Sequence, residues 1–108
     1  MIFEVIAVPP FIRELKRLSK KFPSLKNDVG GLVALLTDNP TMGIPLGNHC
    51  FKIRLAITSK GKGKSGGGRV ITHVHVQGQR VYLLDIFDKT ERATASPQQI
   101  AALLKHIP

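Results

Sequence analysis

The stretch Lys60-Gly-Lys-Gly-Lys-Ser-Gly-Gly-Gly-Arg69 places three lysines and five glycines between two strand-like runs, Cys50–Ile57 and Val70–Val76. Glycine tolerates positive φ angles and lets a backbone approach a ligand closely, whereas lysine and arginine neutralise phosphates. A flexible basic loop that joins two strands suits an extended polyanion. We therefore expect the elements before this loop to build its scaffold and the elements after it to complete the sheet.

The whole chain is strongly basic, because 16 lysines and arginines against 7 acidic residues give a net charge of +9 and a pI near 10.2. Such a charge favours a polyanionic partner, with nucleic acid as the first expectation, or an acidic protein partner. The 108 residues suit one hydrophobic core, so a single domain is predicted over residues 1–108. Aromatic rings are few, which predicts few platforms for stacking bases.

Cysteine usage and hydropathy predict the compartment. Cys50 is the only cysteine, which excludes an internal disulfide and fits a reducing cytoplasm. No apolar run approaches the roughly 18 residues of a membrane span. The first residues also lack the positive region of a signal peptide. We expect a cytoplasmic protein that does not bind membranes.

The first 40 residues or so predict a strand followed by a helical hairpin. Ile2–Val8 is short, apolar and β-branched, as in a buried or half-buried strand. Helical spacing then covers Phe11–Lys21 and a second segment that runs from Ser24 to about Thr37. The expected apolar stripes are Ile12, Leu15, Leu18 and Phe22 in the first helix and Leu25, Val29, Leu32, Val33, Leu35 and Leu36 in the second.

Three details of this hairpin lead to expectations of their own. Ser24 is a good N-cap for the second helix. Gly30-Gly31 inside that helix predicts close packing against a neighbour, because each glycine costs up to about 1 kcal/mol relative to alanine. The first helix carries its cations on the outer faces: Arg13, Lys16, Arg17, Lys20 and Lys21. These form either an ordinary solvated face or a second contact for nucleic acid or an acidic partner.

The second half predicts a meander of three strands and a terminal helix. Thr41–His49 is expected to be a loop, after which Lys52 and Arg54 alternate with apolar residues and so share one face of a half-buried strand. Val70–Val76 follows the basic loop, and the apolar run Arg80–Phe87 is expected inside the sheet. A Ser-Pro-Gln-Gln start predicts the last helix. The resulting class is α+β, in the order β-α-α-β-β-β-α, with a mainly antiparallel sheet.

Two motifs near the loop suggest other chemistry, but both are incomplete. Gly63-Lys64-Ser65 resembles the end of a P-loop, yet Thr58 stands where that motif needs a glycine, and a strand follows where it needs a helix. His73 and His75 offer two metal ligands on one strand face, whereas zinc sites usually take three or four. No Ser-His-Asp or Cys-His arrangement is evident. We therefore expect no metal and no cofactor.

The element order, the strand around Cys50-Phe-Lys-Ile-Arg-Leu55 and the block Gly61–Ile71 resemble the RelE/ParE superfamily of bacterial toxins, above all the HigB/RelE-like members of type II toxin–antitoxin modules. The resemblance runs from Phe3 through the 88–92 loop, and the loop block is its more specific part. It implies a small antiparallel sheet with a helical hairpin on one face and a basic concave face opposite. RelE-like members cut mRNA in the ribosomal A site without metal, and a cognate antitoxin wraps the toxin.

The resemblance also implies which residues act. Lys52 and Arg54 match the family's paired basic residues on the second strand. Arg69 matches an arginine that opens the third strand and contacts the reacting phosphate, and Lys89 lies where relatives keep a basic residue after the fourth strand. The expected catalytic set is therefore Lys52, Arg54, Arg69 and Lys89. The expected RNA-binding set is Lys60, Lys62, Lys64 and Arg92.

Cleavage of this kind begins with attack by the 2′-hydroxyl on the neighbouring phosphate and leaves a 2′,3′-cyclic phosphate and a 5′-hydroxyl. It needs a base, stabilisation of the phosphorane and an acid for the leaving oxygen. Arg54 and Arg69 can stabilise charge, and Lys52 is a candidate base because cationic neighbours favour its neutral form. His73 or His75 can exchange a proton near neutral pH if it shares that face; otherwise both are exposed polar residues.

Three functions remain open at this level. The first is a ribosome-dependent mRNA endonuclease toxin, whose partners would be the antitoxin, the ribosome and mRNA. The second is a ParE-like toxin that inhibits DNA gyrase by protein binding without nuclease activity. The third, a protein that only binds RNA, stays open because Thr90 and Ser96 stand where RelE has an arginine and a tyrosine.

Overall fold

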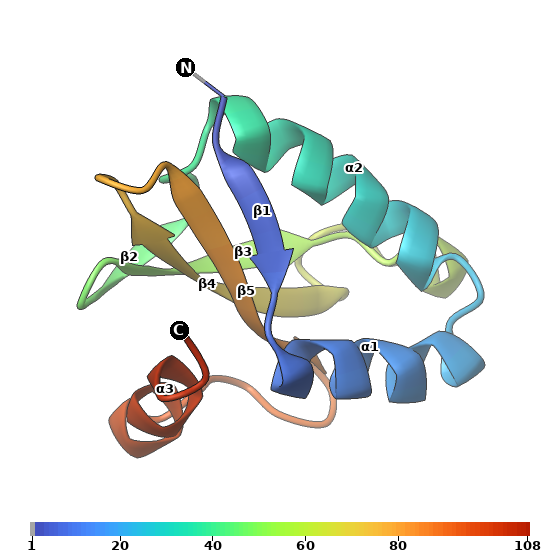
Figure 1. Ribbon diagram of the computed structural model, residues 1–108. Helices are drawn as coiled ribbons and strands as arrows, with labels where there is room; N and C mark the ends of the chain where they lie inside the picture. Colours follow the sequence, from blue (N-terminus) through green and yellow to red (C-terminus); the bar gives the residue numbers. More distant parts are fainter. Residues whose placement is uncertain (1) are drawn as a thin grey trace.

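Five strands form one sheet, in the order β1-β5-β4-β3-β2, in a computed structural model that describes residues 2–108 (Figure 1). The strands are β1 (Glu4–Ala7), β2 (Ile44–Gly47), β3 (Cys50–Leu55), β4 (Gly68–His75) and β5 (Arg80–Asp88). Neighbouring strands are antiparallel except for β1, which pairs in parallel with β5. The expected α+β class with a mainly antiparallel sheet is confirmed, and β5 lies inside the sheet as expected.

Three α-helices accompany the sheet: α1 (Pro9–Lys21), α2 (Leu25–Asp38) and α3 (Pro97–Leu104). Figure 1 shows α1 and α2 together on the right and α3 apart from them at the lower left. The capping box at the start of α3 is confirmed, since Ser96 Oγ accepts from the backbone of Gln99 and the Gln99 side chain accepts from the backbone of Ser96. No helix within residues 2–108 is long and apolar enough to cross a membrane.

The hairpin of α1 and α2 packs against the sheet through one continuous core. Phe11 and Leu18 of α1 are each 1% exposed, whereas Ile12 is 54% exposed. Leu35 of α2, also expected in the core, is 54% exposed as well. The expected stripe in α1 is confirmed at Leu18 and Phe22, but its first member is wrong, because Phe11 rather than Ile12 is buried.

Two other expectations for this half of the chain are wrong. Gly30 and Gly31 have no heavy atom within 4 Å of where a Cβ would stand, so close packing does not explain them. The region from Thr41 to His49 is not only a loop, because it contains β2. A two-residue turn joins β2 to β3, with Asn48 and His49 at φ angles of 54° and 58°. That conformation is typical of tight hairpins, and asparagine adopts it readily.

Ser24 precedes α2 as expected, but its side chain makes no N-cap hydrogen bond. Its hydroxyl donates instead to Asp28 and contacts Ser59 Oγ at 2.9 Å. Asp28 also accepts from the backbone and the hydroxyl of Thr58, at 3.0 and 2.6 Å. These bonds tie α2 to the 3₁₀ turn η1 (Thr58–Lys60), which begins the basic loop.

Candidate nucleic-acid interface

Strand pairing places the expected basic residues on one face of the sheet. Arg54 of β3 lies opposite Arg69 of β4, and Lys52 lies opposite Ile71. Directly opposed residues of an antiparallel pair point to the same side, and every second residue along a strand does so too. Lys52, Arg54 and Arg69 therefore share a face, and His73 and His75 lie further along it.

Two of these residues and a lysine of the loop meet in a cavity. Lys52, Arg54 and Lys64 line a space of about 320 Å³, whose other walls are Met42, Gly43, Ile44 and Ile53. A second space, of about 420 Å³, shares Met42, Arg54 and Lys64 and extends to α2. We call the first space the basic cavity. It combines three cations with an apolar wall, which suits a phosphate with an attached sugar or base.

Arg69 does not open into this cavity as a free cation. It is 5% exposed, and its Nη1 donates to the carbonyl oxygens of Lys64 at 3.0 Å and Gly68 at 2.8 Å. Its Nη2 donates to the carbonyl oxygen of Ser65 at 3.3 Å. Burial lowers the pKa of Arg69, and the charge of Arg54 lowers it further. The guanidinium therefore binds the basic loop itself.

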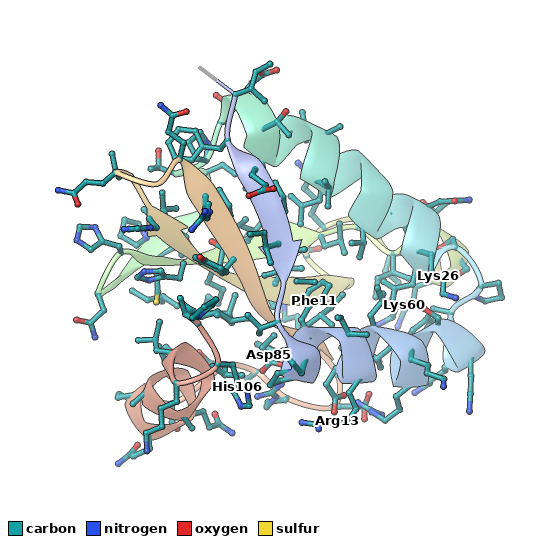
Figure 2. The ribbon with its side chains drawn as sticks, viewed as in Figure 1. Phe11, Arg13, Lys26, Lys60, Asp85 and His106 are labelled. Atoms are coloured by element: carbon teal, nitrogen blue, oxygen red, sulfur yellow. The ribbon has the colours of Figure 1, made fainter. Side chains whose placement is uncertain are left out.

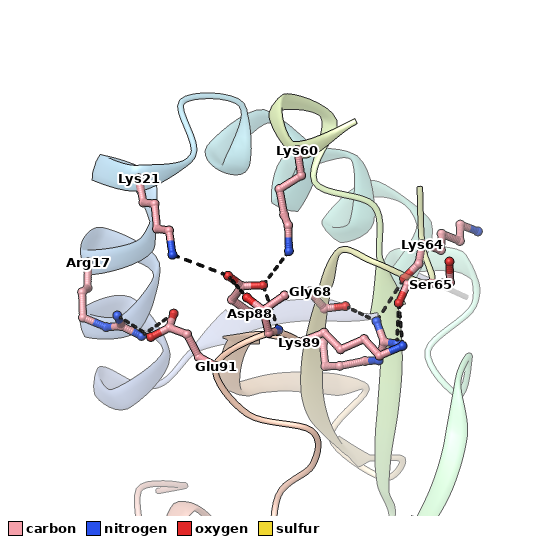
Figure 3. A network of polar contacts seen from close by, with 11 residues as sticks. Arg17, Lys21, Lys60, Lys64, Ser65, Gly68, Asp88, Lys89 and Glu91 are labelled. Carbon is pink, nitrogen blue, oxygen red and sulfur yellow. Dashed lines mark hydrogen bonds and ion pairs between the residues drawn. The ribbon is translucent and has the colours of Figure 1, made fainter. Parts of the chain in front are cut away.

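Lys89 reaches the same part of the loop from the end of β5. Its Nζ donates to the Ser65 carbonyl oxygen at 2.8 Å, and its backbone N–H donates to Gly67 at 3.2 Å (Figure 3). The Lys89 residue is nevertheless exposed. Two residues expected to be catalytic, Arg69 and Lys89, thus share one carbonyl acceptor.

The loop is more tightly fixed than its glycine content predicts. A Cβ on Gly67 would collide with the carbonyl oxygen of Leu55 and would lie 3.0 Å from the backbone nitrogen of Ile57. Only glycine allows this approach of the loop to the backbone that follows β3. Lys62 and Lys64, expected to bind RNA, are exposed on the loop. The glycines therefore serve close packing as well as turning.

Lys60 was expected to bind RNA, and the structure places it elsewhere. Its ammonium lies 2.7 Å from Asp88 Oδ1, and its side chain is 9% exposed (Figures 2 and 3). Asp88 is fully buried and also accepts from Thr90. Burial alone would raise the pKa of Asp88, but the hydrogen bonds from Lys60 and Thr90 hold it below its usual value. Lys60 therefore stabilises the fold and is not available to a phosphate.

Arg92, also expected to bind RNA, is paired too. Its Nη2 lies 2.6 Å from Asp85 Oδ2, and its Cζ lies 4.1 Å from the centre of the Phe87 ring. Arg92 lines a larger cavity, of about 440 Å³, together with Arg17. Arg17 is itself paired with two glutamates. Two of the three arginines of this larger cavity are thus paired, and the carboxylates that pair with them also line it, so it is a weaker candidate for an anion than the basic cavity.

The histidines line a separate space. His49, His73 and His75 surround about 420 Å³ that Lys52 and Arg54 do not line. The pKa of His73 is lowered by burial, an effect that a backbone hydrogen bond at Asn48 opposes and that the neighbouring histidines reinforce. Within residues 2–108, no three His, Cys, Asp or Glu side chains are grouped to hold a metal ion. The expected histidines thus share the face but not the cavity.

Sequence reasoning missed the apolar wall of the basic cavity. Met42 and Ile44 lie in the segment expected to be a plain loop, and Ile44 is 50% exposed. The sequence feature that could have indicated β2 was the Asn-His turn that follows it.

The hydrogen bonds that fix η1 to α2 were also missed, because they join residues that are far apart in the sequence.

Fold and cavity together define a class: this is a small α+β protein with a RelE-like fold. No family model matches the chain. Two solved structures of a double arginine-to-alanine mutant of E. coli toxin RelE are similar to it, and each match covers 100% of both chains. The free toxin is 14% identical with a TM-score of 0.67. The toxin in complex with a peptide of antitoxin RelB is 19% identical with a TM-score of 0.57.

Proposed function

We propose that this chain is the toxin of a type II toxin–antitoxin pair and that it cleaves mRNA on the ribosome without a metal ion. One observation carries the proposal: Lys52, Arg54 and Lys64 converge on a single cavity with an apolar wall. The net charge of +9 and the similarity to the fold of toxin RelE support it. A single strand of RNA needs such a combination of cations and apolar surface.

The chemistry follows from the types of group in the basic cavity. Lys52 takes the proton of the RNA 2′-hydroxyl, whose oxygen attacks the adjacent phosphorus. Arg54 and Lys64 stabilise the charge on the phosphorane. The bond from phosphorus to the 5′-oxygen breaks, and the Lys64 ammonium returns a proton to that oxygen. The products are a 2′,3′-cyclic phosphate and a 5′-hydroxyl.

A cognate antitoxin is the protein partner that we propose. Toxin RelE, similar in fold, is known in complex with an antitoxin peptide. The present chain offers a strongly basic surface, on which an acidic or amphipathic segment would gain both charge pairing and apolar contact. Purification of the chain with the product of a neighbouring gene tests this partner.

Cleavage is tested by mapping the 5′ ends of mRNA after brief induction, and in a translation reaction with programmed ribosomes. The wild-type chain should cut within codons, and Arg54→Gln should not. Lys105→Gln is the matched control, because it removes one exposed positive charge at the end of α3, away from the basic cavity.

Two outcomes would contradict the proposal. Growth arrest that persists in Arg54→Gln, together with inhibited DNA supercoiling, would indicate a ParE-like gyrase toxin. Binding of RNA and ribosomes without any cleavage by the wild-type chain would indicate a protein that only binds RNA.

A further inference from the structure

We infer that Arg69 is a positioning residue rather than a phosphate ligand: with Lys89, it holds the loop backbone so that Lys64 stays beside the basic cavity, which it lines. This inference rests on the proposed function and refines it. It changes the role that the resemblance assigns to Arg69, and it explains what holds Lys64 where the proposed chemistry needs it.

The side-chain hydrogen bonds of Arg69 go to the backbone of the loop and of the first residue of β4. Its guanidinium donates to the carbonyl groups of Lys64, Ser65 and Gly68. These acceptors are neutral carbonyl oxygens. They satisfy the N–H groups of the buried guanidinium in place of an acidic side chain. Arg69 is 5% exposed, and its guanidinium is bound to three backbone carbonyl groups, so it has little freedom to follow a moving phosphate.

Lys89 gives the same part of the loop a second attachment. Its ammonium binds the Ser65 carbonyl oxygen at 2.8 Å (Figure 3). The guanidinium of Arg69 donates to the same oxygen. A loop rich in glycine loses much conformational entropy when it is ordered. Like charges on Lys64 and Arg54 also oppose the approach of the loop to β3. The hydrogen bonds from Arg69 and Lys89 therefore offset the entropy lost by the loop and the repulsion between Lys64 and Arg54.

A double-mutant cycle between Arg69 and Lys64 tests the inference. Arg69→Gln, Lys64→Gln and the double variant are compared with wild type by kcat/KM for mRNA cleavage on programmed ribosomes. If Arg69 acts through Lys64, Arg69→Gln should lower kcat/KM by about tenfold in the wild-type background. In the Lys64→Gln background, it should have almost no further effect. Effects that multiply would show that Arg69 acts independently of Lys64 and would overturn the inference.

A second readout does not depend on cleavage. Trypsin cuts after exposed lysines, so release of the loop in Arg69→Gln should speed cutting after Lys62 and Lys64, while Lys105 is cut at the wild-type rate. Binding of a short RNA with a 2′-deoxy group at the cleavage position, measured by fluorescence anisotropy, should show the same coupling as kcat/KM. An unchanged trypsin rate would overturn the inference.

Lys89→Met provides the test if Arg69→Gln fails to fold, because the Lys89 residue is exposed. It should act in the same direction as Arg69→Gln, with a smaller effect, and should also be coupled to Lys64→Gln. If wild type cleaves no RNA, the proposed function fails. The trypsin and binding measurements still decide whether Arg69 holds the loop.

Discussion

Lys60 and Lys64 lie four residues apart in one glycine-rich segment, and the fold uses them in opposite ways. The Lys60 side chain is 9% exposed and meets the buried carboxylate of Asp88. Lys64 is exposed and lines a cavity beside other cations. A lysine that faces a buried carboxylate becomes part of the core, whereas one among like charges stays available to an anion. Position relative to acidic groups, rather than charge count, therefore separates the two roles.

The same division runs through the other cations. Arg92 and Arg17 form ion pairs, and Arg69 binds backbone carbonyls. Within residues 2–108, no ion pair joins an acidic residue to the three cations of the basic cavity, Lys52, Arg54 and Lys64. Keeping three like charges together without partners costs stability. That arrangement is expected where a polyanion supplies the missing charge.

The largest effect on mRNA cleavage should come from a substitution among the three unpaired cations of the basic cavity. Arg54→Gln should lower kcat for mRNA cleavage by about 10²- to 10³-fold, because it removes a charge that stabilises the phosphorane. The free energy of unfolding in urea should change by no more than about 0.5 kcal/mol, since Arg54 is exposed. A large loss of stability would break the comparison, because Arg54 would then belong with the paired cations.

Lys60→Met should show the opposite pattern. Loss of the ammonium leaves Asp88 buried without its main charge partner, which should destabilise the fold by about 3 kcal/mol. Cleavage per folded molecule should stay unchanged. Urea titration gives the first quantity and a cleavage assay at low temperature gives the second. Adding Asp88→Asn to Lys60→Met should recover part of the stability, and no recovery would argue against the ion pair as the cause.

Much of the fold could be predicted because its elements carry local signals. Alternation in β3, the apolar run of β5 and the Ser-Pro-Gln-Gln start of α3 each depend on residues that are close in sequence. β2 was missed because it is four residues long and carries a proline and a glycine. The shift from Ile12 to Phe11 in α1 depends on how the helix is rotated against the sheet, which its own sequence does not settle.

The candidate site divides in the same way. Alternation was enough to place Lys52 and Arg54 on one face of β3, but only the register between β3 and β4 places Arg69 on that face too. Nor could alternation show that Lys60 would meet Asp88, 28 residues later, or that Arg69 would bind the loop. These pairings depend on the register between strands and on the path of the loop. Charge in a sequence therefore predicts a basic surface better than it predicts which cations are free.

Gly67→Ala tests whether the segment between the two lysines is fixed. The added methyl group would collide with the Leu55 carbonyl oxygen, so the loop must move away from β3. We expect destabilisation of about 2 kcal/mol, as for other overpacked sites. Cleavage should fall as well, because Lys64 moves with the loop. Unchanged urea unfolding would show that the loop moves away at little cost and would weaken the contrast between Lys60 and Lys64.

Acid should weaken the fold by protonating Asp88, the carboxylate that pairs with Lys60, and should leave the cations of the basic cavity unchanged. The pKa of Asp88 is lower in the folded chain than its usual value, so the unfolded chain binds the proton more tightly. The stability from Asp88 is therefore complete above about pH 4 and is lost as the pH falls through the folded pKa. Urea unfolding from pH 6 to pH 2.5 should show a steeper decline for wild type than for the Lys60→Met/Asp88→Asn variant. Parallel curves would assign the acid sensitivity to other carboxylates.

Gly30 and Gly67 are both glycines, but their surroundings differ. A substitution of Gly30 should have the smallest effect of those considered. Gly30 lies within α2, is exposed and has open space where a Cβ would stand. Alanine there loses less conformational entropy on folding, so Gly30→Ala should stabilise the chain by about 0.5 to 1 kcal/mol. The urea midpoint should rise, opposite in sign to Gly67→Ala, with cleavage unaffected. A fall in the midpoint would mean that Gly30 packs against something after all, as its sequence context first suggested.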